Sequence, residues 1–116
     1  MNNREKGAVY EAVASKFLEG KGYRILEQNF RCRTGEIDII AQDGTYLVFV
    51  EVKYRSKQKQ GSAAMAVNYK KQQTISRVAA FYLLKNRLPD SVPCRFDVIA
   101  IDGEEIHHYE NAFDYI

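Results

Sequence analysis

Residues 35–55, GEIDIIAQDGTYLVFVEVKYR, are the stretch that decides the fold of this chain. The dipeptide Asp43-Gly44 separates two apolar segments and is a strong signal for a two-residue hairpin turn. The sequence therefore predicts two antiparallel strands, GEIDIIAQ and TYLVFVEVKY. Asp38, Glu51 and Lys53 lie inside these apolar segments, where a charged side chain needs a partner or a metal ion.

The predicted turn fixes the face of the hairpin on which each side chain lies. Gln42 lies opposite Thr45, and Asp38 lies opposite Phe49. One face is then almost wholly apolar and is expected to be the core; it comprises Ile37, Ile39, Ala41, Tyr46, Val48, Val50 and Val52. The other face carries Glu36, Asp38, Phe49, Glu51 and Lys53. Asp38 and Glu51 become diagonal neighbours, roughly 5–8 Å apart at Cβ.

Two carboxylates this close indicate a cation between them, because they would otherwise repel each other. Mg²⁺, with Mn²⁺ as an alternative, takes oxygen ligands and commonly uses one or two carboxylates plus a substrate phosphate. Lys53 lies on the same face and is placed to hold a water or to offset charge on a phosphate. The alternative is a salt-bridged trio without a chemical role. The prediction depends on turn length, since one extra loop residue would move Asp38 to the opposite face.

The rest of the pattern predicts an α/β fold, a central mixed sheet flanked by helices in the order α-β-β-β-α-β-β. The first helix is expected over 4–21, with Val9, Val13 and Phe17 on its apolar stripe and Ala14 and Leu18 beside it. Gly22 is the expected residue after its end.

Four further elements complete the predicted order. A strand is expected over 23–33, and the second helix begins within 63–69 and ends near Leu88. Its apolar stripe is Ile75, Val78, Ala79, Tyr82 and Leu83. Residues 94–102 are a fourth strand, and residues 105–113 are either a short last strand or an irregular tail.

The composition is that of one folded domain over residues 1–116, with 46% hydrophobic residues to form a core. No apolar run approaches the roughly 18 residues needed to cross a bilayer, and the polar start MNNREKGAVYEA has no secretory signal. Cys32 and Cys94 lack metal-type spacing and are expected to be reduced thiols. A cytoplasmic location is therefore expected.

The charge distribution is uneven although the net charge is only +2. From Val52 to Pro89 the chain has no Asp or Glu but nine Lys and Arg residues. A basic segment of this kind is typical of proteins that bind a polyanion such as nucleic acid. The alternative is an ordinary solvated helix face.

The pair GEID (35–38) and VEVK (50–53) resembles the PD-(D/E)xK nuclease core of the restriction-endonuclease-like superfamily, with Ile37-Asp38 in place of Pro-Asp. Nearly the whole chain resembles the YraN family, small bacterial proteins predicted to be endonucleases and distantly similar to Holliday-junction resolvases. The positions that carry this resemblance are Gly7, Glu11, residues 22–26, Asn29, Arg31, residues 35–38 and 48–53, Arg55, Gly61, Lys71 and residues 95–99.

The resemblance implies a restriction-endonuclease-like fold and a metal-dependent endonuclease acting on branched or otherwise structured DNA. Asp38 and Glu51 would ligate Mg²⁺ with the Val52 carbonyl, Lys53 would be the catalytic lysine, and Glu11 would point toward the metal. Tyr10 stands where the family often has Gly. Small nucleases of this kind often grip DNA as a homodimer. The competing hypothesis is a nuclease-like module that binds nucleic acid or a partner without cutting.

Further polar residues are candidates for contacts around the site. Backbone contacts to nucleic acid are expected from Arg55, Lys57, Lys59, Lys70, Lys71 and Gln72, although Lys71 and Gln72 also fit an ordinary helix start. Glu36 is either an accessory group of the metal site or a partner of Arg31 or Arg33. Tyr46, Tyr54 and Tyr69 either stack on unpaired bases or pack against the protein. His107-His108 is expected on the surface, and Asp97 is expected to pair with an Arg.

Overall fold

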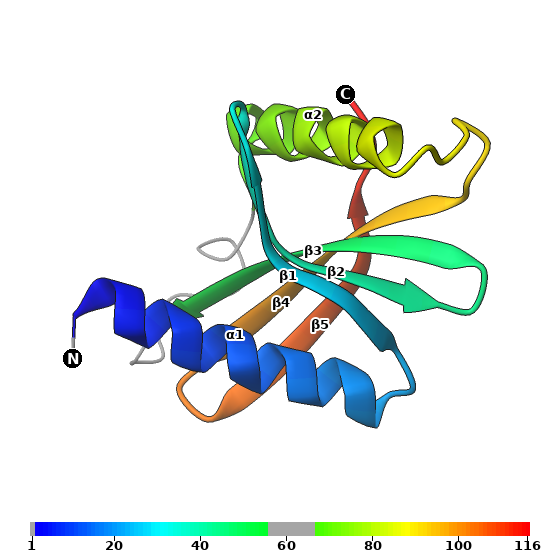
Figure 1. The fold of residues 1–116 in the computed structure, drawn as a ribbon. Helices are drawn as coiled ribbons and strands as arrows, with labels where there is room; N and C mark the ends of the chain where they lie inside the picture. Colours follow the sequence, from blue (N-terminus) through cyan, green and yellow to red (C-terminus); the bar gives the residue numbers. More distant parts are fainter. Residues whose placement is uncertain (1, 56–66) are drawn as a thin grey trace.

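The computed structural model describes residues 2–55 and 67–116, in which a mixed five-stranded sheet lies between two helices (Figure 1). The elements are α1 (Asn3–Gly20), β1 (Arg24–Cys32), β2 (Gly35–Asp43), β3 (Tyr46–Arg55), α2 (Tyr69–Lys85), β4 (Cys94–Asp102) and β5 (Glu105–Phe113). The strands are neighbours in chain order; β3 and β4 are parallel, and the other neighbouring strands are antiparallel. The predicted mixed sheet and element order are confirmed, and the segment after Asp102 is a full strand.

Local sequence signals define both ends of α1. Asn2 accepts the Glu5 N–H at 2.9 Å, and the Glu5 carboxylate accepts the Asn2 N–H at 3.1 Å, which is a capping box. At the other end, Gly22 has a φ of 94°. The Tyr23 N–H bonds to the Leu18 carbonyl, as in a Schellman motif. Gly22 thus ends the helix as predicted, because a left-handed residue is needed there.

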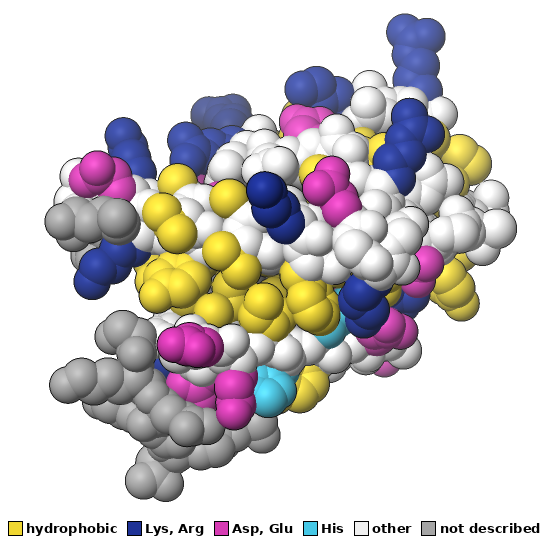
Figure 2. Space-filling view, turned by 90° about the horizontal axis from the view of Figure 1, so that it is seen from below, with side chains coloured by type: hydrophobic (Ala, Val, Ile, Leu, Met, Phe, Trp, Pro, Cys, Tyr) yellow, Lys and Arg dark blue, Asp and Glu magenta, His cyan; other side chains and the backbone are white. Residues whose placement is uncertain are grey.

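The buried stripe of α1 differs from the predicted one. Ala14 and Leu18 are fully buried, whereas Val9 is 47% and Val13 38% exposed. The helix is rotated so that Ala14, Ser15 and Leu18 face the sheet, and Phe17 packs only at the edge of the core. Seen from the α1 side, hydrophobic side chains form a band, with most Lys and Arg side chains on one side of it (Figure 2). The prediction that Val9 and Val13 face the core was wrong.

Each face of the sheet has its own hydrophobic core. Under α1 the core cluster includes Ile39, Val48 and Val50, and under α2 it includes Ile40 and Phe49. The predicted stripe of α2 is confirmed, since all five of its residues are buried. The second face of the β2–β3 hairpin is therefore not only a charged face. It is apolar where α2 covers it and charged beyond the N-terminal end of that helix.

The hairpin register differs by two residues from the predicted one. Asp43 pairs with Tyr46, so the two loop residues are Gly44 and Thr45. Gly44 has a φ of 60°, and Thr45 is not among the residues with positive φ. Glycine at the first loop position is the requirement of a type II′ turn, which explains why the loop begins one residue later than predicted. A shift of two residues keeps every β3 side chain on its predicted face.

Ile37 lies on the opposite face of the sheet from Ile39 and Ala41, with which it was predicted to share a face. It is buried in the cluster under α2, with Phe30 as its partner on β1. The pairing of β2 with β3 extends only to Ile39 and Val50, and beyond that point β1 and β2 curve away toward α2 (Figure 1). This bend carries Ile37 across to α2, which strand alternation alone does not predict.

Gly35, at the start of β2, lies close to the side chains of α2. A Cβ at this position would lie 2.7 Å from Thr74 Cγ2, and the Thr74 hydroxyl is hydrogen-bonded to the Lys70 carbonyl at 3.2 Å. Gly35→Ala is therefore expected to lower the free energy of unfolding by about 1–3 kcal/mol through overpacking. Urea-induced unfolding measures this change.

Thr74→Ser is the matched change for Gly35→Ala, because it removes the clashing methyl group and keeps the hydroxyl. The double variant should recover most of the lost stability. Equal stability of Gly35→Ala and the double variant would show that the two side chains do not meet as the structure places them.

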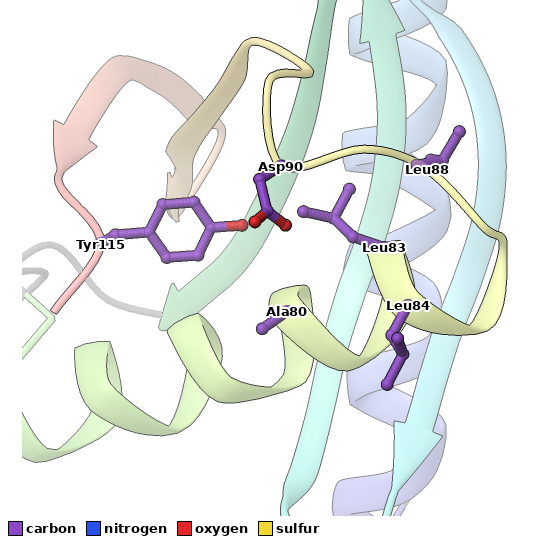
Figure 3. A pocket seen from close by; sticks show the side chains of 6 residues that line it. All are labelled: Ala80, Leu83, Leu84, Leu88, Asp90 and Tyr115. Carbon is purple, nitrogen blue, oxygen red and sulfur yellow. The ribbon is translucent and has the colours of Figure 1, made fainter.

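A pocket of about 420 Å³ lies at the C-terminal end of α2 (Figure 3). Apolar side chains of Leu83, Leu84 and Leu88 line it together with Asp90 and Tyr115. The centre of this pocket is roughly 20 Å along α2 from Lys71, at about 1.5 Å per residue.

Among the described residues, no helix has both the length and the apolar character needed to cross a membrane.

Candidate active site

Asp38 and Glu51 form the centre of the candidate site, at the point where β2 leaves β3. Continuing the register one residue past Ile39 and Val50 places Asp38 opposite Glu51. Asp38 Oδ2 accepts the Val52 N–H at 2.8 Å, so this side chain satisfies a backbone group that β2 no longer reaches. The Glu51 side chain is 13% exposed. The fold thus holds two partly buried carboxylates, called the carboxylate pair below, against each other.

The surroundings of the carboxylate pair disfavour the ionisation of both groups at once. Burial and then the charge of Asp38 raise the pKa of Glu51 to about 7. Burial also raises the pKa of Asp38, and a side-chain hydrogen bond joins the two groups. Two buried carboxylates in contact cannot both ionise without a compensating positive charge. Their electrostatics therefore favour the binding of a cation.

Two lysines border the carboxylate pair. Lys71 Nζ lies 3.8 Å from Glu51 Oε2, and the Lys71 N–H is bonded to the cap residue Asn68 at 2.8 Å. Lys53 follows Glu51 by two residues and shares its side of β3. The positive charges of both lysines oppose the rise in the pKa of Glu51. The end of β3 and the N-terminal ends of both helices lie on one side of the molecule, at the left of Figure 1.

A third carboxylate reaches the site from α1. Glu11 forms side-chain hydrogen bonds with Asp38 and Asn29, and its pKa is raised by burial and then by the charge of Asp38. Tyr10 stacks on Tyr54 with ring centroids 4.3 Å apart, which joins α1 to β3 beside Glu11. Tyr10 stands where the resemblance leads one to expect Gly, and its ring packs against the sheet. Glu11 thus lies beside Asp38, and the metal-site role that the resemblance implies for it stays a prediction.

Asn29 is the site residue that the sequence-based prediction gave no role. It has a φ of 54°, and the β1–β2 pairing omits it between Gln28 and Phe30. Asn is among the few residues that tolerate the left-handed region. An Asn within a run of strand-forming residues is therefore the sequence signal that could have identified this irregular position in β1.

The available donors fit a hard divalent cation. Asp38 and Glu51 supply carboxylate oxygens, and Glu11 lies next to Asp38. The Val52 N–H points toward Asp38, and the N–H and C=O of one strand residue point to the same neighbouring strand, so the Val52 carbonyl is directed to this side too. Within residues 2–55 and 67–116, no group of three or more His, Cys, Asp or Glu side chains is arranged so that it could hold a metal ion. Mg²⁺ characteristically completes such a partial set with waters and substrate oxygens.

The predicted nucleic-acid contacts fall into three groups. Lys70 is exposed and Lys71 contacts Glu51, so both lie at the N-terminal end of α2 beside the site. Gln72 donates to the Val67 carbonyl at 2.8 Å, and Arg55 pairs with Asp102 at 3.3 Å. Lys57 and Lys59 lie outside the residues that the structure describes.

The remaining candidates have defined partners. Arg31 Nε lies 3.4 Å from Glu36 Oε1, which is one of the two expected arrangements for Glu36. Asp97 is fully buried and pairs with Arg95 at 2.9 Å, as expected. His107 is exposed, but the His108 side chain is only 3% exposed and contacts Asp97 at 2.7 Å. The prediction of a surface position was therefore wrong for His108, because a buried acid on β4 draws it inward.

The raised pKa of Glu51 predicts a pH dependence of stability in the metal-free protein. The folded state keeps a proton that the unfolded chain releases near pH 4.5, so stability should fall as pH rises from about 4.5 to about 7. At about 1.4 kcal/mol per pKa unit, the loss is on the order of 1–3 kcal/mol. Urea-induced unfolding at a series of pH values in EDTA measures it. Glu51→Gln is the control and should flatten this part of the curve; parallel curves for the two proteins would contradict the assignment.

The fold and the site together define the class of protein as an α/β domain with a mixed sheet. Three carboxylates and two lysines lie close together where β2 separates from β3. Residues 10–101 match the profile of the family described as "Uncharacterised protein family UPF0102". The chain belongs to this family.

Relatives match this chain over almost its whole length. A UPF0102 protein of Alkaliphilus oremlandii (strain OhILAs) is 52% identical over 116 residues, covering 96% of this chain and 99% of the relative. One from Lachnoclostridium phytofermentans (strain ATCC 700394 / DSM 18823 / ISDg) is 50% identical over 114 residues, covering 98% and 97%. The UPF0102 protein lpg2994 of Legionella pneumophila subsp. pneumophila (strain Philadelphia 1 / ATCC 33152 / DSM 7513) is 43% identical, with 96% of each chain covered.

Proposed function

We propose that this UPF0102 protein is a metal-dependent endonuclease of the cytoplasm that hydrolyses phosphodiester bonds in branched or structured DNA. The observation that carries the proposal is the buried carboxylate pair, with Glu11 on one side and Lys53 and Lys71 on the other. A purely structural site would not need two partly buried acids in contact, because they cannot both ionise without a compensating positive charge. The similarity of GEID and VEVK to the PD-(D/E)xK core, and of the chain to the YraN family, supports the same function.

Each side chain has a role in this proposal. Asp38 and Glu51 would hold Mg²⁺ or Mn²⁺ with the Val52 carbonyl, and Glu11 would support Asp38 from α1. The metal, when bound, would act as a Lewis acid that offsets charge on the phosphate and on the leaving oxygen. Lys53 holds the attacking water and compensates the charge that develops on the phosphate.

Lys71 links substrate binding to the state of the carboxylate pair. The Lys71 side chain is 42% exposed, and its ammonium group lies at the long end of ion-pair distance from Glu51, at 3.8 Å. Such a contact is weak and easily exchanged. Lys71 is therefore free to exchange Glu51 for a substrate phosphate, with Lys70 beside it.

The test is cleavage of end-labelled single-stranded, duplex, flap and four-way-junction DNA with Mg²⁺, Mn²⁺ or EDTA. Metal-dependent cutting of the flap or junction above the plain duplex is the expected result. Salt-sensitive binding without cutting of any DNA would replace the nuclease with a non-catalytic nucleic-acid-binding module. Sedimentation of the protein with and without the junction tests whether two copies act together.

A further inference from the structure

A pocket of about 450 Å³ opens on the α1 side of the site. Side chains from the first half of α1 and from the bend of β1 and β2 line it, namely Arg4, Ala8, Glu11, Asn29, Arg31 and Glu36. This set is called the α1 pocket below. Glu11 lines the α1 pocket and is also hydrogen-bonded to Asp38 of the carboxylate pair. The α1 pocket and the candidate active site are therefore contiguous.

The α1 pocket carries two guanidinium groups, those of Arg4 and Arg31. The Arg31 and Glu36 side chains are 66% and 41% exposed, and the closest recorded contact between them uses only Arg31 Nε, at 3.4 Å. An exposed ion pair contributes only about 0–1 kcal/mol, so Arg31 can exchange Glu36 for another anion at little cost. A guanidinium prefers the planar, two-pronged contact that a phosphate offers.

Arg31 and Lys71 lie on opposite sides of the carboxylate pair. Arg31 lies on the α1 side through Glu11 and Asn29, and Lys71 lies on the α2 side through Glu51. α1 and α2 pack on opposite faces of the sheet. A chain of phosphates that passes the carboxylate pair therefore meets a basic side chain both before and after it.

We propose that the α1 pocket binds a phosphodiester group next to the one that lies at the carboxylate pair, on the same nucleic-acid strand, through Arg31 and Arg4. This inference rests on the proposed nuclease function and adds a substrate class to it. The volume of the pocket is within the about 300–1,000 Å³ typical of small-ligand sites, which suits one strand rather than a duplex. The strand that enters is one separated from its complement, as at a flap or junction.

Asn29 is a positioning residue in this arrangement. It lines the α1 pocket and is hydrogen-bonded to Glu11, and its backbone is left-handed, with a φ of 54°. Asn29 holds the Glu11 carboxylate beside Asp38. The negative charge of Glu11 is thus directed to the carboxylate pair instead of to the bound phosphate.

Ala8 offers a sharp test, because it lines the α1 pocket from an exposed helix position. Ala8→Glu and Ala8→Gln have nearly equal side-chain volume and differ in charge. Binding of fluorescein-labelled single-stranded, duplex and junction DNA is measured by anisotropy in EDTA, so that no cutting is needed. Ala8→Glu should raise the Kd for single strands and junctions at least about fivefold over Ala8→Gln, with little change for the duplex.

Arg31→Gln gives an independent readout through salt. Loss of one phosphate contact should weaken single-strand binding and reduce the slope of log K against log salt by about 0.7–1. Lys16→Gln removes a charge from the exposed side of the same helix, outside the α1 pocket, and should leave that slope nearly unchanged. Arg31→Lys should recover part of the affinity, which separates a phosphate contact from a folding defect.

The outcomes separate this inference from the proposed function. If wild type cuts while Ala8→Glu and Arg31→Gln bind and cut as wild type does, the α1 pocket proposal is overturned and the nuclease stands. If Arg31 and Ala8 control binding but no metal supports cutting, the pocket stands and the nuclease is overturned. Equal losses on duplex and on single-stranded DNA would overturn the single-strand assignment, and absence of any binding by wild type would overturn both proposals.

Discussion

Asp38→Asn is expected to reduce metal-dependent DNA cleavage by roughly 1,000-fold while leaving the protein folded. A metal ion stabilises the charge of a phosphoryl transition state by several kcal/mol, and about 4 kcal/mol corresponds to three orders of magnitude in rate. Asn keeps an oxygen that accepts the Val52 N–H, which the structure records at 2.8 Å for Asp38 Oδ2. It removes one of the two negative charges that the metal needs. The cleavage rate on the preferred DNA, at saturating Mg²⁺, measures the effect.

Two further readouts separate catalysis from folding for Asp38→Asn. The metal-free variant should melt at or above the wild-type temperature, because a buried charge beside Glu51 is gone. Its DNA affinity in EDTA should be equal or higher, since repulsion of phosphate falls. Glu27→Gln, at an exposed position on β1, is the matched loss of one carboxylate and should cut like wild type. Cleavage by Asp38→Asn within about tenfold of the wild-type rate would exclude the metal role of Asp38.

The strand faces near the site were predictable because they depend on parity. The turn was misplaced, with Gly44 and Thr45 rather than Asp43 and Gly44 as loop residues. That error moved the register by two residues, and the side-chain repeat of a strand is two. Asp38 and Glu51 therefore stayed neighbours, directly opposite instead of diagonal. An error of one residue would have lost the site.

Features that depend on the bend of the sheet were not predictable from local pattern. Ile37 follows the alternation of its strand, yet it packs under α2 because β2 leaves β3 beyond Ile39. The approach of Lys71 to Glu51 depends on the packing of α2 across that bend. The hydrophobic pattern of α1 likewise favoured Val9 and Val13, whereas the sheet accepts Ala14 because a small side chain lets the helix approach closely.

A buried ionic network on β4 and β5 lies outside the candidate site and has the largest expected effect on stability. Asp97 is fully buried and accepts hydrogen bonds from Arg95 at 3.0 and 2.9 Å and from the Asn111 N–H at 3.0 Å. His108 contacts it at 2.7 Å. The Arg95 side chain is only 10% exposed and also pairs with Asp43. Removal of Asp97 would leave a buried guanidinium without its main partner.

Asp97→Ala is therefore expected to lower the free energy of unfolding by about 3–5 kcal/mol, which is a large part of the about 5–15 kcal/mol typical of a domain. Urea-induced unfolding followed by circular dichroism should show a lower midpoint with a similar slope. Asp43→Asn is the matched control, since it weakens a half-exposed partner of the same Arg95 and should cost about 1 kcal/mol or less. In the double variant Arg95→Met/Asp97→Leu, part of the stability should return, because the unpaired charge is gone. Similar losses for Asp97→Ala and Asp43→Asn would show that the buried carboxylate does not hold this network together.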